Sequence, residues 1–118
     1  MGRAGVWYTD DLTVNHALIE APKNFRRCHR LSLNHVVMPN AAETLWHCDG
    51  VTMDDVMAKR DYFAMNSQNM KISNFELVGN YSFDGVKNVE VHHAKMLQLK
   101  DGYQLPNLQV FLQLQQGE

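Results

Sequence analysis

Histidine and lysine side chains that could transfer a proton lie close together in the segment NVEVHHAKMLQL, residues 88–99. Apolar residues occupy alternate positions in it, as a half-buried strand requires, at Val89, Val91, Leu97 and Leu99. The same alternation places His93 and Lys95 on the apolar side. Because a histidine and a lysine removed from water suit acid–base chemistry near neutral pH, both are candidate catalytic residues, with Tyr81 beside them.

Each of these residues also has a structural interpretation. His93 would then be a core histidine that hydrogen-bonds to a neighbour, and Lys95 would lie at a strand end with its ammonium group in solvent. In a regular strand His92 points away from His93, so the two are not expected to bind one metal ion.

Two Asp-Gly sequences are typical of turns between antiparallel strands, and they predict the strand register. A two-residue loop at 101–102 places His93 opposite Val110. A three-residue loop at 83–85 places Phe75 opposite His93 and Leu77 opposite Val91, so that apolar faces meet. These turns predict a meander of three long antiparallel strands, 71–83, 87–100 and 104–115.

The rest of the chain suggests two helices and two short strands. A helix is expected within 8–25, ending near Ala21 before Pro22, and a second over 52–67, where Thr52 can cap the first turn. Short strands are expected within 30–38 and 42–50, although this region could instead hold another helix. We find no internal repeat. The predicted fold is a single α+β domain over 1–118, with a curved antiparallel sheet packed on two or three helices as a cone-like barrel.

Composition limits the partners and the compartment. The 118 residues carry a formal net charge of −2, so no overall basic field favours nucleic acid. No apolar run approaches the ~20 residues of a membrane span, and no signal peptide is recognisable, which predicts a cytoplasmic protein. Cys28 and Cys48 are expected to be free thiols. Each adjoins a histidine without the usual ligand spacing, so neither a metal nor another cofactor is expected.

The order of elements, with a DG-terminated strand, a capped helix and long final strands, resembles the nuclear transport factor 2-like superfamily. That superfamily includes SnoaL-like cyclases and ketosteroid isomerases. The resemblance covers residues 10–115 and implies a curved sheet around a conical apolar cavity. The segment TLWHCDG would place His47 where the isomerases carry a carboxylate base. The residues expected to line the cavity are Trp46, Asp49, Phe75, Leu77 and Val110.

Two functions are consistent with this interpretation. In the first, the protein binds a small hydrophobic molecule in an apolar cavity and acts as a cofactor-independent lyase or isomerase, for example on a polyketide-like substrate. His47 or His93 would move the proton, and Tyr81 and Lys95 would stabilise an oxyanion. In the second, it is a non-catalytic ligand- or protein-binding module. A homodimer is expected through the outer sheet face, formed by Val78, Ala94, Met96 and Phe111.

Overall fold

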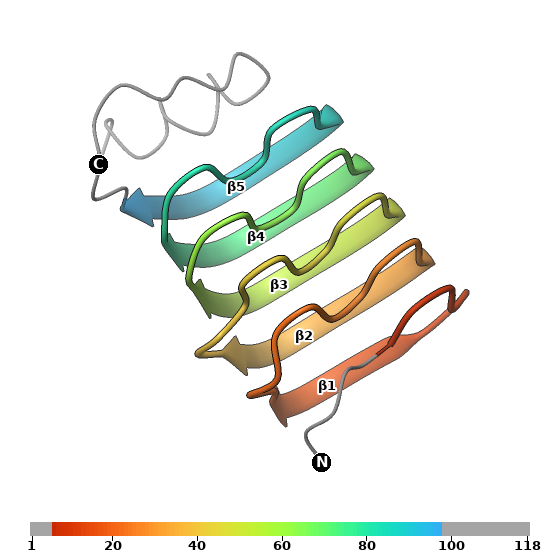
Figure 1. The fold of residues 1–118 in the computed structure, drawn as a ribbon, viewed down its shortest axis with the longest axis horizontal. Coiled ribbons are helices and arrows are strands. Elements are labelled where there is room, and N and C mark those ends of the chain that lie inside the picture. The colour runs from red at the N-terminus through yellow and green to blue at the C-terminus, as the bar shows by residue number, and fades with distance from the viewer. Residues whose placement is uncertain (1–5, 98–118) are drawn as a thin grey trace.

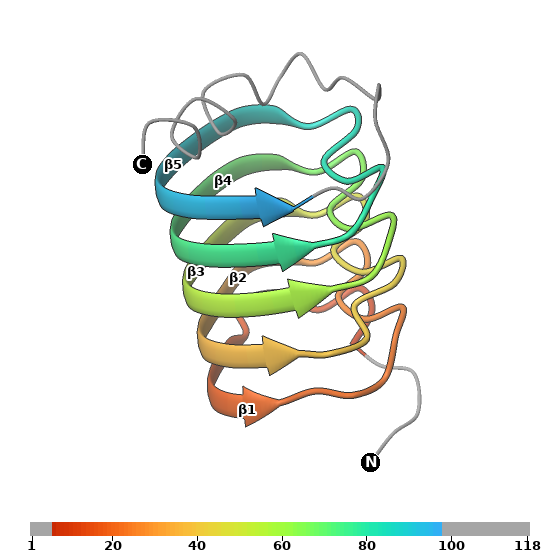
Figure 2. The ribbon, with the colours of Figure 1, turned by 90° about the vertical axis from the view of Figure 1, so that its left-hand side faces the viewer.

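The computed structural model describes residues 6–97, and within them every regular element is a β-strand (Figure 1). The strands are β1 (Thr13–Leu18), β2 (His29–Met38), β3 (Asp49–Lys59), β4 (Gln68–Val78) and β5 (Lys87–Leu97). They form one sheet in the order β1-β2-β3-β4-β5, and all neighbouring pairs are parallel. The chain therefore winds as a β-solenoid, in which each coil adds one strand to the sheet (Figure 2).

Equivalent residues of successive coils lie 19 or 20 positions apart. One row of such residues runs across all five strands, and each member is paired with the next: Thr13, Ser32, Thr52, Lys71 and Glu90. The connections stack as well. The backbone N–H of Leu45 donates to Asn24 O at 3.0 Å, and that of Phe83 donates to Phe63 O at 2.7 Å. Hydrogen bonds between coils thus satisfy backbone groups in the strands and in the connections.

Each strand curves around the side of the coil (Figure 2). Near the middle of each strand, one residue has a positive φ angle. We call this position the second bend; its residues and φ angles are His16 (53°), His35 (56°), Asp55 (60°), Asn74 (50°) and His93 (59°). In β5 the bend makes two consecutive side chains, His92 and His93, face solvent, after which Ala94 is buried. A left-handed residue interrupts strand alternation because it turns the following backbone.

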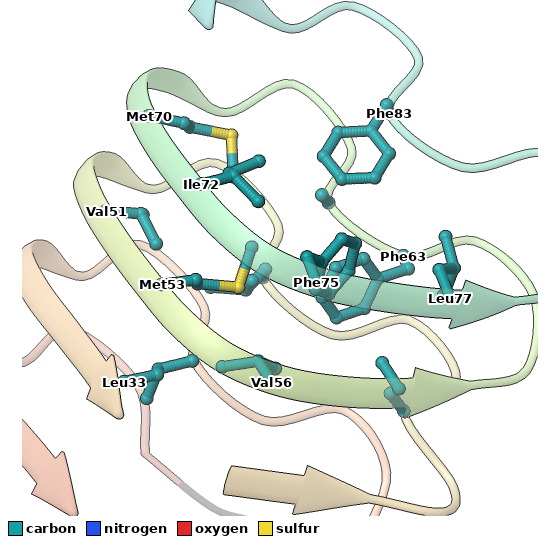
Figure 3. Close-up of a cluster of buried hydrophobic side chains, with 14 of the residues drawn as sticks. Leu33, Val51, Met53, Val56, Phe63, Met70, Ile72, Phe75, Leu77 and Phe83 are labelled. Atoms are coloured by element: carbon teal, nitrogen blue, oxygen red, sulfur yellow. The ribbon is translucent and has the colours of Figure 1, made fainter. Parts of the chain in front are cut away.

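The interior of the coil is filled with apolar side chains (Figure 3). Phe63 is fully buried there, and its ring centroid lies 5.7 Å from that of Phe75 and 5.8 Å from that of Phe83. Burial of one such side chain stabilises the fold by roughly 1.5–3 kcal/mol. Stacking of like residues in successive coils therefore supplies the core of the protein, with no second layer of helices over the described residues.

The prediction of an α+β cone with an antiparallel sheet is wrong, and so is the resemblance to the nuclear transport factor 2-like superfamily. The segment expected as a helix over 52–67 begins inside β3. Inward side chains there are Val51, Met53, Val56 and Ala58. Inward residues are two positions apart along most of the strand, but Met53 and Val56, on either side of the bend, are three positions apart. A spacing of three is also typical of a helix, which explains the wrong prediction. The helix expected within 8–25 contains β1 for the same reason.

The predicted hairpin at 83–85 is also wrong. Lys87, which follows it, pairs in parallel with Gln68, so this segment is the connection that carries the chain to the next coil. The expected strands 30–38, 71–83 and 87–100 overlap β2, β4 and β5, whereas most of 42–50 belongs to a connection. The expected strand 104–115 lies outside the described residues. The described part of the chain has no helix long and apolar enough to cross a membrane.

Candidate functional site

His93 and Lys95 lie on the outer surface of β5, not toward the core. They line a pocket of about 230 Å³ together with the outward residues Asn74 and Glu76 of β4. We call it the second-bend pocket. Glu76 and Lys95 are neighbours in register. The side chains of Glu76, His93 and Lys95 have no hydrogen bond or ion pair within residues 6–97.

The other two predicted catalytic residues lie in connections. His47 is exposed before β3, and Tyr81 follows β4, where its ring stacks on Tyr62 with a centroid distance of 5.4 Å. Neither residue lines the second-bend pocket. The structure therefore brings His93 and Lys95 together but does not place His47 or Tyr81 with them.

The predicted substrate-binding residues are dispersed. The indole N–H of Trp46 donates to Tyr62 O at 2.7 Å, and the Arg26 guanidinium lies over its ring at 4.4 Å. Phe75 and Leu77 belong to the core. Asp49 is the first residue of β3, and Val110 lies outside the described residues. Two residues of the expected dimer face, Ala94 and Met96, are also in the core.

A larger groove of about 440 Å³ crosses the outer surface from β2 to β5. It follows a second line of positive-φ residues near the strand starts, which we call the first bend: Asp11 (57°), Arg30 (57°), Gly50 (86°), Asn69 (58°) and Asn88 (57°). The polar side chains that line this first-bend groove are Arg30, Ser32, Thr52, Asn69, Lys71, Asn88 and Glu90. Because these residues come from four coils, only the stacking of coils brings them together.

Amide groups form a hydrogen-bonded ladder along one wall of the groove. Asn88 Nδ2 donates to Asn69 Oδ1 at 2.5 Å, and Asn69 Nδ2 donates to Asp49 Oδ1 at 2.7 Å. Gln68 Nε2 donates to the other carboxylate oxygen of Asp49 at 3.0 Å. These amides, first Asn69 and then Gln68, hold the pKa of Asp49 below its ordinary value of 3.8. The ladder fixes the orientation of the Asn69 and Asn88 side chains in the groove.

Arg30 is held at the β2 end of the groove by a two-point contact with Asp11. Its Nε lies 2.6 Å from Asp11 Oδ1 and a terminal nitrogen lies 3.1 Å from Oδ2. This hydrogen bond lowers the pKa of Asp11. A guanidinium bound in this way is oriented before any ligand arrives, and it retains further N–H groups.

The second wall consists of outward residues in register, Ser32, Thr52, Lys71 and Glu90. The hydroxyls of Ser32 and Thr52 make no hydrogen bond with other described residues. Glu90 accepts from His92 Nε2 at 3.1 Å, which with the charge of Lys71 lowers the pKa of Glu90. The wall therefore offers hydroxyl, ammonium and carboxylate groups to solvent.

The polar groups of the groove are hydrogen-bond donors and acceptors on an open surface. Among the described residues, no cluster of three His, Cys, Asp or Glu side chains could hold a metal ion. Sequence reasoning missed this groove because its residues are ordinary polar residues until the repeat of 19 or 20 positions is recognised. The signal that could have found them is a repeated strand pattern, in which two inward apolar residues on alternate positions are followed by two outward residues and then by two more inward apolar residues on alternate positions, as in Met70, Ile72, Phe75 and Leu77.

A family model described as "Protein of unknown function (DUF3737)" matches residues 1–118. No curated protein and no solved structure matches the chain.

Proposed function

The chain belongs to the DUF3737 family, and we propose that this member is a non-catalytic binding module that holds an extended polyhydroxylated chain, a carbohydrate, in the first-bend groove. The observation that carries the proposal is the groove itself, which has a volume of about 440 Å³, continues across β2 to β5 and is lined by polar side chains from all four strands. Binding sites are concave and use a few fixed polar groups for orientation.

The repeat of the groove favours a linear ligand. Neighbouring strands of a sheet are about 4.8 Å apart, so the walls present polar groups at regular intervals along the solenoid axis. Lys71 and Glu90 on one wall stand opposite Asn69 and Asn88 on the other in the same two coils. A chain whose own donors and acceptors recur at intervals can contact several coils at once.

The charge of the groove and the pairing of its strands indicate which class of polymer it can bind. The acids Asp11 and Glu90 accompany the bases Arg30 and Lys71, so the surface lacks the excess of positive charge that a nucleic acid requires. A peptide that adds a strand needs a free sheet edge, whereas β3 and β4 are paired on both sides. Hydroxyl groups of a carbohydrate can donate to the carboxylate and amide oxygens and accept from the ammonium and guanidinium groups.

The test is binding of the full chain to linear oligosaccharides of glucose, xylose, mannose or galacturonic acid, measured by isothermal titration calorimetry. Lys71→Ala and Asn88→Ala should each weaken binding about tenfold, which corresponds to ~1.4 kcal/mol. The matched controls are Lys59→Ala, on β3 outside the groove, and Asn74→Ala, at the second bend; neither should change the affinity. If none of these oligosaccharides binds, the proposal is wrong.

The second-bend pocket favours a second candidate, the small-molecule lyase or isomerase expected from the sequence. Its support is that an imidazole, a carboxylate and an ammonium group, from His93, Glu76 and Lys95, line one pocket. If the pocket is catalytic, His93→Gln should abolish turnover of an identified substrate and leave the melting temperature unchanged. Equal turnover by the wild type and by His93→Gln would show that His93 has no catalytic role.

A further inference from the structure

The amide ladder along the first-bend groove begins at a carboxylate. Asp49 is the first residue of β3 and does not line the groove itself. Both of its carboxylate oxygens are occupied: Oδ1 accepts from Asn69 Nδ2 at 2.7 Å, and Oδ2 accepts from Gln68 Nε2 at 3.0 Å. Asn69 Oδ1 in turn accepts from Asn88 Nδ2 at 2.5 Å. Two residues of the groove, Asn69 and Asn88, are therefore connected by hydrogen bonds to a residue outside it.

An ionised carboxylate gives such a ladder a direction. Asn69 and Gln68 lower the pKa of Asp49, so its carboxyl group is ionised at neutral pH and can only accept hydrogen bonds. Asn69 must therefore turn its Nδ2 toward β3 and its Oδ1 toward β5. That orientation requires Asn88 to turn its own Nδ2 toward Asn69. An asparagine amide alone has no such preference, because it can both donate and accept.

We infer that Asp49 is a positioning residue: through the ladder it fixes which atoms of Asn69 and Asn88 the groove offers to a ligand. This inference rests on the proposed carbohydrate binding. Each Nδ2 keeps one hydrogen that the ladder does not use, and Asn88 Oδ1 accepts no hydrogen bond from the described residues. Oxygens of the bound chain would accept from the two amides, and a hydroxyl would donate to Asn88 Oδ1. Because the amides are already oriented, binding orders few side chains.

The second bend contains the same pair of residues outside the groove. Asp54 lies one position before the second-bend residue of β3, and it accepts from Asn74 Nδ2 at 2.9 Å. Asp49 and Asn69 have the same relation at the first bend. Neither Asp54 nor Asn74 lines the first-bend groove. Asp54→Asn removes the same charge from the same strand and is therefore the matched control for Asp49→Asn.

A double-mutant cycle tests whether Asp49 acts through the ladder. Affinity for the oligosaccharides named above is measured by isothermal titration calorimetry at pH 7, with circular dichroism as the folding check. Asp49→Asn should weaken the best ligand at least about threefold, because an amide at this position no longer dictates the direction of the ladder, and Asp54→Asn should not change its affinity. Asn69→Gly cuts the ladder, and glycine tolerates the φ of 58° there. In that background Asp49→Asn should cause no further loss.

Nuclear magnetic resonance tests the ladder without a ligand. Asp49→Asn should shift the side-chain amide signals of Asn88, which lies two strands away, because the change in direction passes through Asn69. Asp54→Asn should leave those signals in place. Unchanged Asn88 signals in Asp49→Asn would mean that Asp49 does not orient the ladder, and the inference would then be wrong.

The binding results separate the inference from the proposed function. If the wild type binds and Asp49→Asn binds equally well, the inference at Asp49 fails while carbohydrate binding stands. If the losses from Asp49→Asn and Asn69→Gly multiply in the double variant, Asp49 acts on the ligand independently of the ladder and the inference also fails. If the wild type binds no oligosaccharide, the proposed function fails and takes the role of Asp49 in ligand binding with it, whatever the amide signals show.

Discussion

His92 and His93 are adjacent in the chain and both lie on the outer surface of β5, because His93 has a φ of 59°. The residues on either side, Val91 and Ala94, are both buried. The same arrangement recurs in the coil before, where Ser73 and Asn74 separate the buried residues Ile72 and Phe75. The bend thus divides each strand into two arms whose inward side chains line adjoining sides of one core.

The first prediction concerns the backbone at this bend. His93→Val should lower the free energy of unfolding by roughly 1–2 kcal/mol, because a β-branched residue is poorly accommodated at positive φ. His93→Asn should be neutral or slightly stabilising. Urea denaturation measures both. The control is His92→Val at the neighbouring exposed position, and an equal loss for the two valine variants would contradict the role assigned to the bend.

The second prediction separates the buried from the exposed face of the sheet. Met96 is 4% exposed and Met57 is 37% exposed. Met96→Glu should destabilise the protein by roughly 3 kcal/mol or more, since it buries an unpaired carboxylate, whereas Met57→Glu should leave the melting temperature nearly unchanged. Differential scanning calorimetry makes the comparison, and similar melting temperatures would contradict the orientation of β5.

The sequence placed a homodimer contact on Val78, Ala94, Met96 and Phe111, of which Ala94 and Met96 are buried, so a different, exposed row is tested with the same Met57 variant. Leu18, Val37 and Met57 are exposed and lie side by side in register on β1, β2 and β3. If the outer face holds two copies together through this apolar row, Met57→Glu should halve the mass measured by light scattering. An unchanged mass would remove this row as a dimer contact.

The sequence predicted where several strands lie but not how they pair. Apolar alternation located β2, β4 and β5 because Leu31 and Leu33, for example, obey it up to the bend. Pairing could not be predicted because an Asp-Gly sequence such as Asp84-Gly85 fits either a hairpin or a left-handed turn between coils. The repeat was hidden because the core accepts any apolar residue of suitable size at equivalent positions, such as Leu31, Val51 and Met70.

The candidate site was harder still to predict. His93 and Lys95 were recognised as unusual, and they do line a pocket, but on the outside of the strand. The groove at the first bend depends on residues such as Arg30, Gly50 and Asn88, which are separated by whole coils. Each of them alone is an ordinary surface or turn residue. Only the register of parallel strands makes them neighbours.

The third prediction is acid destabilisation through Asp49. Its pKa is lowered in the folded protein, so folding is stabilised when the carboxyl is ionised, above its unfolded pKa near 3.8. That stabilisation is lost as the pH falls through the lower folded pKa. The melting temperature should therefore fall as the pH is lowered below about 4. The decrease should be smaller in Asp49→Asn, which cannot titrate, and an identical decrease in the two proteins would contradict the contribution of Asp49.

The fourth prediction concerns the thiols of Cys28 and Cys48, which are buried at equivalent positions of successive coils. Cys48 Sγ lies 3.0 Å from Phe25 O, and burial raises the pKa of its thiol to about 12. Both sulfur atoms are buried, so neither cysteine should react with an aromatic disulfide reagent at pH 8 in the folded protein, and both should react in guanidinium chloride. Thr13→Cys adds an exposed thiol that should react at once and calibrates the assay. Prompt reaction of Cys28 or Cys48 without denaturant would mean that the coils carrying β2 and β3 open readily in the native state.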